Sequence, residues 1–125
     1  MALVPGGTPR QALLTARSHG TIALSRAVYD EIAEVLQRPK FARVLSADRR
    51  TEILELLTAA AIWIEPQQRV EDCRDAKDNK YLELALAVSA AAIVSGDEDL
   101  LVLNPWRGIR VLRAAEFLGW LAGSL

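Results

Sequence analysis

An aspartate stands at the start of a helix that the sequence predicts to be buried. In the stretch RDAKDNKYLELALAVSA, residues 74 to 90, Asp78 precedes Leu82 and Ala85 at helical spacing. At 100° per residue these three side chains point to one side, so a carboxylate leads the face that the helix turns toward the core. Asp78 can be a helix-terminal acid, with Asp75 as the cap, or it can serve a buried site.

Three further acids occupy comparable positions in other segments. Asp97 and Asp99 directly follow the apolar run AAIVSG, residues 91 to 96, and Glu31 lies on the flank of an earlier helix's apolar stripe. Each has an alternative interpretation, as a turn or capping residue for the aspartates and as a surface residue for the glutamate. In a parallel sheet, however, these positions all fall near the carboxyl ends of the strands, where functional crevices form.

Grouped carboxylates predict a bound cation, because they repel one another and lose hydration when they are buried together. Oxygen ligands without histidine or cysteine favour a hard ion, Mg²⁺ or Mn²⁺. Such an ion serves phosphate chemistry, and the sequence contains no glycine-rich phosphate loop. The pattern therefore favours phosphodiester hydrolysis.

Length and composition predict one soluble domain spanning residues 1–125. Hydrophobic residues make up 51% and charged residues 25% of the 125, with a net charge of −1. One cysteine and one histidine exclude an internal disulfide and a zinc site of the Cys/His type, and they suggest the cytoplasm. The longest uncharged run, at 84 to 96, is shorter than the roughly 20 residues of a membrane span. Residues 51 to 100 carry eleven acidic and four basic residues, so the middle of the chain is acidic and the ends are basic.

Strand and helix patterns alternate along the chain. Apolar strands are predicted at 21–25, 61–66, 91–96 and 109–112, and PGGTP at 5–9 is predicted to be a turn or loop. Helices are predicted at 10–20, 26–38, Ala47–Ala60, after Asp78 and at 114–123, with Ser25 as an N-cap and Pro39 as a stop. The alternation indicates a three-layer α/β domain with a mainly parallel sheet.

Four blocks of the sequence together resemble a known family. LSRAVYDEIAEVLQRPKF, CRDAKDNKYLELALA, AAIVSGDEDLLVL and GIRVLRAAEFL stand in the order and spacing of PIN domains, and specifically of toxin components of bacterial toxin–antitoxin systems. The resemblance covers nearly the whole chain. It implies a PIN-like, Rossmann-like fold and a ribonuclease that depends on Mg²⁺ or Mn²⁺ and cleaves single-stranded RNA. It further implies a homodimer that is restrained by a cognate antitoxin.

The resemblance also implies which residues form the site. By position, Glu31 is the family's helix acid, Asp78 opens the crossover helix, and Asp97 and Asp99 are the acids after the following strand. Asp75 belongs to the pattern but is better interpreted as a helix cap. All four site acids are expected to be catalytic and to serve as metal ligands.

The chain departs from the family at its beginning. PIN domains start with a strand ending in an Asp-Thr-Asn type motif, and MALVPGGTPRQALL resembles what normally follows that strand. The sequence therefore predicts an N-terminally truncated domain with weakened metal binding and ribonuclease activity. Its sheet should have three or four strands. The gap should be closed by direct pairing of the neighbouring strands, by insertion of the N-terminal segment, or by exchange with a second copy.

Two other functions compete with the nuclease. A phosphoryl-accepting regulatory domain also gathers acids around Mg²⁺, but it needs a lysine near the end of a late strand, and the last lysine here is Lys80. A catalytically inactive PIN fold that binds an antitoxin or itself is favoured by the missing first-strand aspartate.

Overall fold

Five parallel strands form a single sheet at the centre of the molecule. The structure is a computed structural model that describes residues 2–6 and 20–124. The strand order is β3-β2-β1-β4-β5, and every ladder is parallel. The strands are β1 (Ala2–Gly6), β2 (Thr21–Leu24), β3 (Ala61–Trp63), β4 (Ala92–Ser95) and β5 (Arg110–Leu112). The predicted α/β class with a mainly parallel sheet is confirmed.

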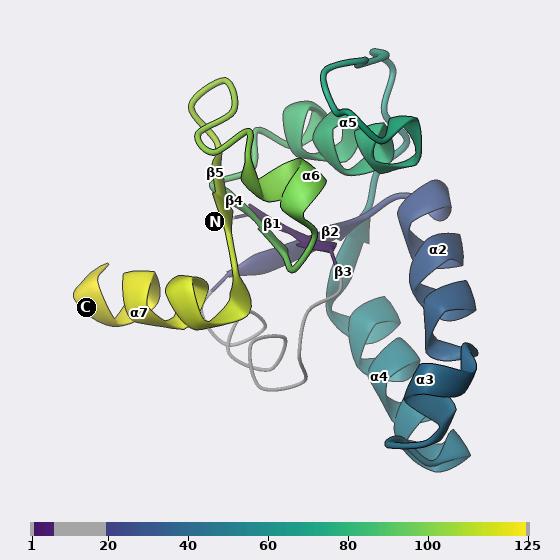
Figure 1. The fold of residues 1–125 in the computed structure, drawn as a ribbon. Helices are drawn as coiled ribbons and strands as arrows, with labels where there is room; N and C mark the ends of the chain where they lie inside the picture. The colour runs from purple at the N-terminus through teal and green to yellow at the C-terminus, as the bar shows by residue number, and fades with distance from the viewer. Residues whose placement is uncertain (1, 7–19, 125) are drawn as a thin grey trace.

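Helices cover both faces of this sheet. Figure 1 shows α5 and α6 on one side and α4 and α7 on the other, with α2 and α3 at the β3 end. Their bounds are α2 (Arg26–Leu36), α3 (Pro39–Ala42), α4 (Ala47–Ala60), α5 (Asn79–Ala87), α6 (Glu98–Leu101) and α7 (Ala114–Ser124). A short 3₁₀ helix, η1 (Ala76–Asp78), precedes α5. Crossover helices run opposite to the strands they connect, so the N-terminus of α5 lies at the carboxyl ends of the strands.

The N-terminal segment occupies the centre of the sheet. The expectation of a sheet with three or four strands was wrong, because β1 lies between β2 and β4 and makes the fifth strand. Among the three ways of closing the gap, the structure shows insertion of this segment. Pro5 and Gly6, predicted to be in a turn, pair with Val94 and Ser95 of β4. Pairing with β2 ends at Leu3, so the proline nitrogen, which cannot donate, lies beyond that ladder.

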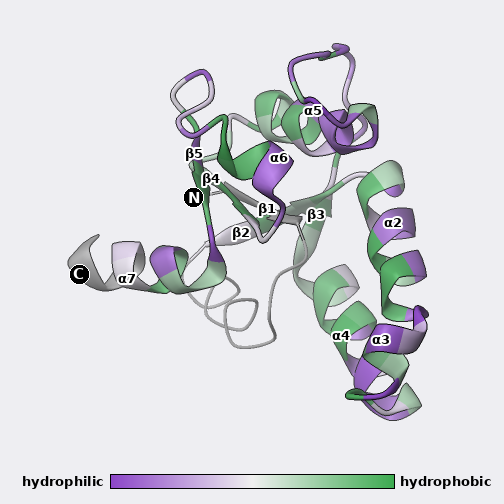
Figure 2. Cartoon of the chain, viewed as in Figure 1, coloured by the Kyte–Doolittle hydropathy of each residue, from purple (hydrophilic) through white to green (hydrophobic). Residues whose placement is uncertain are grey.

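Capping residues, proline and apolar spacing correctly predicted most of the other helices and strands. Ser25 caps α2 by accepting a hydrogen bond from the Val28 nitrogen, and Pro39 begins α3 after α2 has ended. The predicted helix Ala47–Ala60 has those bounds, and the predicted strands are present but shorter by one to three residues. The helix predicted at 10–20 falls almost entirely outside the described residues. In Figure 2, α2 shows apolar and polar stretches that alternate along its turns, as expected of a helix with one buried side.

The core holds α5 rigidly against the sheet. Leu82, Leu84 and Ala85 of this helix are fully buried, as are Ala92 and Ile93 of β4. Close packing of this kind fixes the position of the helix N-terminus, which carries the acids discussed below. No helix among the described residues is long and apolar enough to cross a membrane.

Candidate metal centre

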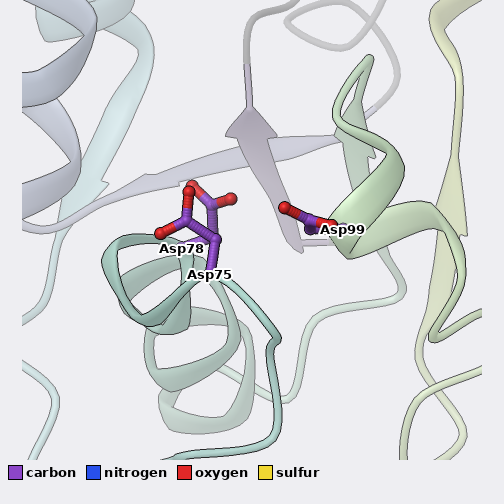
Figure 3. A group of neighbouring side chains, drawn as sticks. All are labelled: Asp75, Asp78 and Asp99. Atoms are coloured by element: carbon purple, nitrogen blue, oxygen red, sulfur yellow. The ribbon is translucent and has the colours of Figure 1, made fainter.

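Three aspartates meet at the carboxyl ends of the strands. Asp75, Asp78 and Asp99 each offer a carboxylate oxygen, and these atoms all lie within 4.8 Å of one another. Figure 3 shows Asp75 and Asp78 on the turn that leads into α5, with Asp99 facing them from α6. Asp78 is buried, and the other two are partly exposed. One side of the group is therefore closed by protein while the other remains open to a substrate.

The η1 turn brings Asp75 and Asp78 together. Asp75 is the N-cap of η1, where its Oδ1 accepts a hydrogen bond from the Lys77 nitrogen at 3.1 Å. A 3₁₀ helix has three residues per turn, so side chains three positions apart stand one above the other. Asp75 was predicted to be only a helix cap. It is a cap, and the same spacing makes it a member of the cluster.

Asp78 has an environment that a cation would complete. Its residue is 6% exposed, and Oδ2 has no hydrogen-bond partner among the residues that the structure describes. Burial, followed by a side-chain hydrogen bond shared with Asp97, raises the pKa of Asp78 to about 7, because two carboxyls can share a hydrogen bond only if one is protonated. An unsatisfied buried oxygen beside two more carboxylates fits a hard divalent ion. Asp75, Asp78 and Asp99 are the residues that would hold it.

Asp97 lies next to this group but outside it. Its Oδ1 accepts a hydrogen bond from the Asp99 nitrogen at 2.9 Å, and its own nitrogen donates to Ser95 Oγ at 3.0 Å. The residue is exposed and caps α6. Its influence on the pKa of Asp78 shows that the two carboxyls are close. The geometry thus gives Asp97 a capping role and leaves one carboxylate oxygen beside Asp78.

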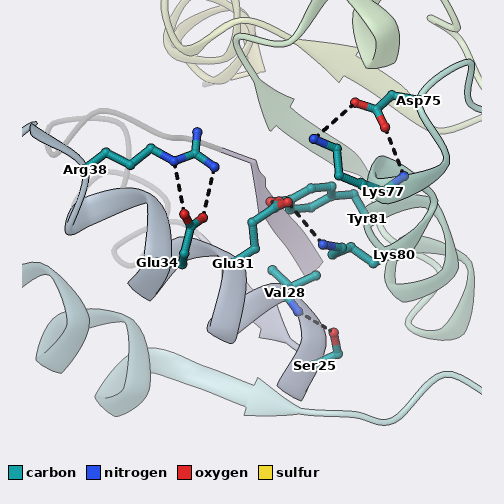
Figure 4. A network of polar contacts seen from close by, with 9 residues as sticks. All are labelled: Ser25, Val28, Glu31, Glu34, Arg38, Asp75, Lys77, Lys80 and Tyr81. Atoms are coloured by element: carbon teal, nitrogen blue, oxygen red, sulfur yellow. Dashed lines mark hydrogen bonds and ion pairs between the residues drawn. The ribbon is translucent and has the colours of Figure 1, made fainter. Parts of the chain in front are cut away.

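Glu31 reaches the same region, but both of its carboxylate oxygens accept hydrogen bonds from other side chains. Its Oε1 accepts a hydrogen bond from Lys80 Nζ at 3.1 Å, and its Oε2 accepts one from the Tyr81 hydroxyl (Figure 4). Burial, together with the Glu31 carboxylate, raises the pKa of Tyr81, so the hydroxyl stays a donor. Glu31 also contributes to the raised pKa of Asp78. It is therefore a neighbour of the cluster that is held by residues at the start of α5.

The loop before η1 is fastened at several points. The Cys73 nitrogen donates to Asn79 Oδ1 at 2.9 Å, and its thiol donates to the Asp99 carbonyl at 3.4 Å. One residue earlier, Asp72 accepts a hydrogen bond from the buried Trp106 indole at 2.8 Å. These bonds hold the segment that carries Asp75 against both α5 and α6. These bonds therefore help to set the separation of Asp75 from Asp99.

The raised pKa of Asp78 makes metal-free stability depend on pH. The unfolded chain ionises this group near 3.8 and the folded chain near 7, so the folded state binds more protons between these values. The contribution of Asp78 to stability should accordingly fall as pH rises from about 4 to 7, by about 1 to 3 kcal/mol, and then stay constant. Urea unfolding in chelator at pH 5.5 and pH 8 measures this. Asp78→Asn should lack this part of the pH dependence, and an equal slope in both proteins would contradict the assignment.

The predicted site residues are distributed unevenly around the cluster. Asp78 and Asp99 belong to it, Asp97 borders it, and Glu31 is linked to Lys80 and Tyr81 instead. That these four are catalytic stays a prediction. Sequence reasoning gave Asp75 no place among the ligands, although the three-residue spacing in DAKD was a signal for it.

Comparison with known proteins agrees with this arrangement. The PIN domain model matches residues 2–99, a range that begins at the first residue of β1. The chain is also 35% identical over 83 residues to the uncharacterized protein MJ1680 of Methanocaldococcus jannaschii. The aligned region covers 64% of this chain and 52% of that protein. The chain thus spans about half the length of the curated relative that it matches. The family match takes in α2, η1 and α5 and ends at Asp99, the second residue of α6, so it covers the acids of the site. The chain therefore belongs to the PIN domain family, whose members are generally nucleases that use divalent metals.

Proposed function

We propose that this PIN domain is an endoribonuclease that cleaves single-stranded RNA with Mg²⁺ or Mn²⁺. The observation that carries the proposal is the buried Asp78 carboxylate, which lies in a cluster with two further carboxylates and has one oxygen without a partner among the described residues. Asp75, Asp78 and Asp99 would hold a hard divalent ion, which would supply water activation and charge stabilisation at the phosphate.

Each acidic side chain around the cluster has its own proposed role. Asp78 supplies the least mobile ligand, since it is fixed by α5 and shielded from water, while Asp75 and Asp99 complete the set from the open side. Asp97 caps α6 through the Asp99 nitrogen and so helps to hold Asp99 at the cluster. Glu31 holds Lys80 and Tyr81, so its role is to position the start of α5 and to keep the region negative.

A cleavage assay with matched variants tests the proposal. Wild-type protein is incubated with a labelled single-stranded RNA and Mn²⁺, beside Asp99→Asn and Glu98→Gln. Glu98 is the neighbouring acid, exposed and paired with Arg113 outside the cluster. We expect cleavage by wild type and Glu98→Gln, and a loss of about tenfold to a hundredfold in Asp99→Asn. Cleavage that persists in chelator, or equally in all three proteins, would contradict a metal-dependent site at these residues.

The biological setting is part of the same proposal. The resemblance to toxin components suggests a cytoplasmic toxin that acts as a homodimer and is inhibited by a cognate antitoxin protein. Growth arrest on expression of the wild type, and not of Asp99→Asn, would support this role. Size-exclusion chromatography with light scattering would show whether the chain is a dimer.

A second candidate is an inactive PIN fold that binds an antitoxin or another copy of itself. It is favoured because β1 contains no acidic residue, whereas the resemblance places a metal ligand at the end of the family's first strand. The cluster of Asp75, Asp78 and Asp99 argues against it, because three carboxylates are still available. Calorimetry with Mn²⁺ separates the two: the inactive module should show no binding that depends on Asp78.

A further inference from the structure

One cation extends from the fastened loop onto the carboxylate cluster. Arg74 lies between Cys73, which is buried and bonded to Asn79, and Asp75, which caps η1. Its guanidinium is 2.8 Å from Asp99 Oδ1, although its side chain is 64% exposed. The backbone on both sides is thus held in place while the charged end remains accessible to solvent.

Two of the other cations in the neighbourhood, Lys80 and Arg113, are less exposed than Arg74. Lys80 is 25% exposed and bound to Glu31, and Arg113 pairs with Glu98 on the exposed side of α6. Lys77 pairs with Asp75 of its own turn at 3.8 Å. Arg74 differs because it spans from the loop to α6 and uses one guanidinium nitrogen on a single carboxylate oxygen. A guanidinium carries five N–H donors in a planar fork, so most of its donors are left for a further acceptor.

The cluster creates a need for such a residue. A phosphodiester that approaches several carboxylates is repelled by them, and one divalent ion offsets only part of that charge. Arginine binds phosphate oxygens through two parallel hydrogen bonds, with geometry that a lysine does not reproduce. A carboxylate has two oxygens, so Asp99 can retain Arg74 through Oδ1 and face the cluster with its other oxygen.

On the basis of the proposed function, we infer that Arg74 is the substrate-binding residue that holds the RNA phosphate at the mouth of the carboxylate cluster. Its backbone is fixed by Cys73 and Asp75, and its pairing with Asp99 keeps the guanidinium at the site before RNA arrives. Arg74 therefore determines the affinity for RNA and not the affinity for the metal.

Binding of a labelled single-stranded RNA in Ca²⁺, measured by fluorescence anisotropy over a range of salt concentrations, tests this role. The RNA is checked afterwards to be intact. Arg74→Gln should raise the Kd about fivefold to twentyfold and lower the slope of log K against log salt by about 0.7, the value for one phosphate contact on a single strand. Arg74→Lys should keep the slope and lose part of the affinity. Arg49→Gln on α4 removes an equal charge elsewhere and should change neither quantity appreciably.

Calorimetry with Mn²⁺ and thermal unfolding distinguish the alternatives. With Arg74→Gln we expect unchanged or tighter Mn²⁺ binding and an unchanged melting temperature. Unchanged RNA affinity and salt slope would overturn the inference and leave Arg74 as a counter-ion of Asp99. Weaker Mn²⁺ binding together with a lower melting temperature would also overturn it, in favour of a purely structural role. If the wild-type protein itself fails to bind RNA, the proposed function is wrong, and so is the proposed role of Arg74.

Discussion

Asp78→Asn is expected to reduce metal-dependent RNA cleavage about a hundredfold or more and, at the same time, to stabilise the metal-free protein. Asparagine keeps the shape of aspartate but offers a neutral oxygen, which is a much poorer ligand for a hard divalent ion. It also removes a buried negative charge that lies beside Asp97, and its amide can donate a hydrogen bond to that carboxylate. The gain should be about 1 to 3 kcal/mol at pH 8.

Two measurements on the same protein samples check this prediction. Cleavage rates in Mn²⁺ report the site, and urea unfolding in chelator at pH 8 reports stability. Glu98→Gln serves as the control, because it removes a nearby but exposed carboxylate. If Asp78→Asn loses both activity and stability, the Asp78 carboxylate stabilises the fold, which would contradict the prediction that it destabilises the metal-free protein. Full activity in Asp78→Asn would remove the residue from the site.

Phe117→Ala is expected to destabilise the protein by about 3 to 5 kcal/mol. Phe117 is fully buried on α7, which packs against the β4 and β5 side of the sheet. The centroid of its ring lies 6.4 Å from that of the Trp120 ring, so truncation leaves a cavity beside a second aromatic side chain. The loss is a large part of the stability that a domain of this size normally has.

The same helix offers a control with the opposite sign. Gly119 is exposed, and a Cβ added there would meet nothing within 4 Å, so Gly119→Ala should stabilise α7 by up to about 1 kcal/mol. Both variants are compared by urea unfolding, followed by fluorescence and by circular dichroism. One shared transition is expected if residues 1–125 form a single domain. Separate transitions by the two probes would show that α7 unfolds on its own.

The sequence alone determined most of the elements and identified carboxylates as the side chains of the candidate site. Apolar spacing defined α4 at its observed bounds, and Ser25 marked the start of α2 because its hydroxyl can bond the helix's free nitrogens. Alternation of strands and helices required a parallel sheet, and parallel strands bring the ends that carry Asp78 and Asp99 to one edge. These features depend on interactions between residues close in sequence, or on a general rule of connection, and a single sequence contains both.

Only the tertiary structure decided the position of β1 and the membership of the cluster. A segment that contains Pro5 and Gly6 has weak strand signals, and its place between β2 and β4 comes from backbone pairing with distant residues. Likewise, Glu31 is bound by Lys80, 49 positions away, while Asp75 lies beside Asp99 because Cys73 links the loop before η1 to α6. Helical spacing shows which face a carboxylate occupies. Which cation or carboxylate it meets across the sheet edge depends on contacts between elements, which only the folded chain contains.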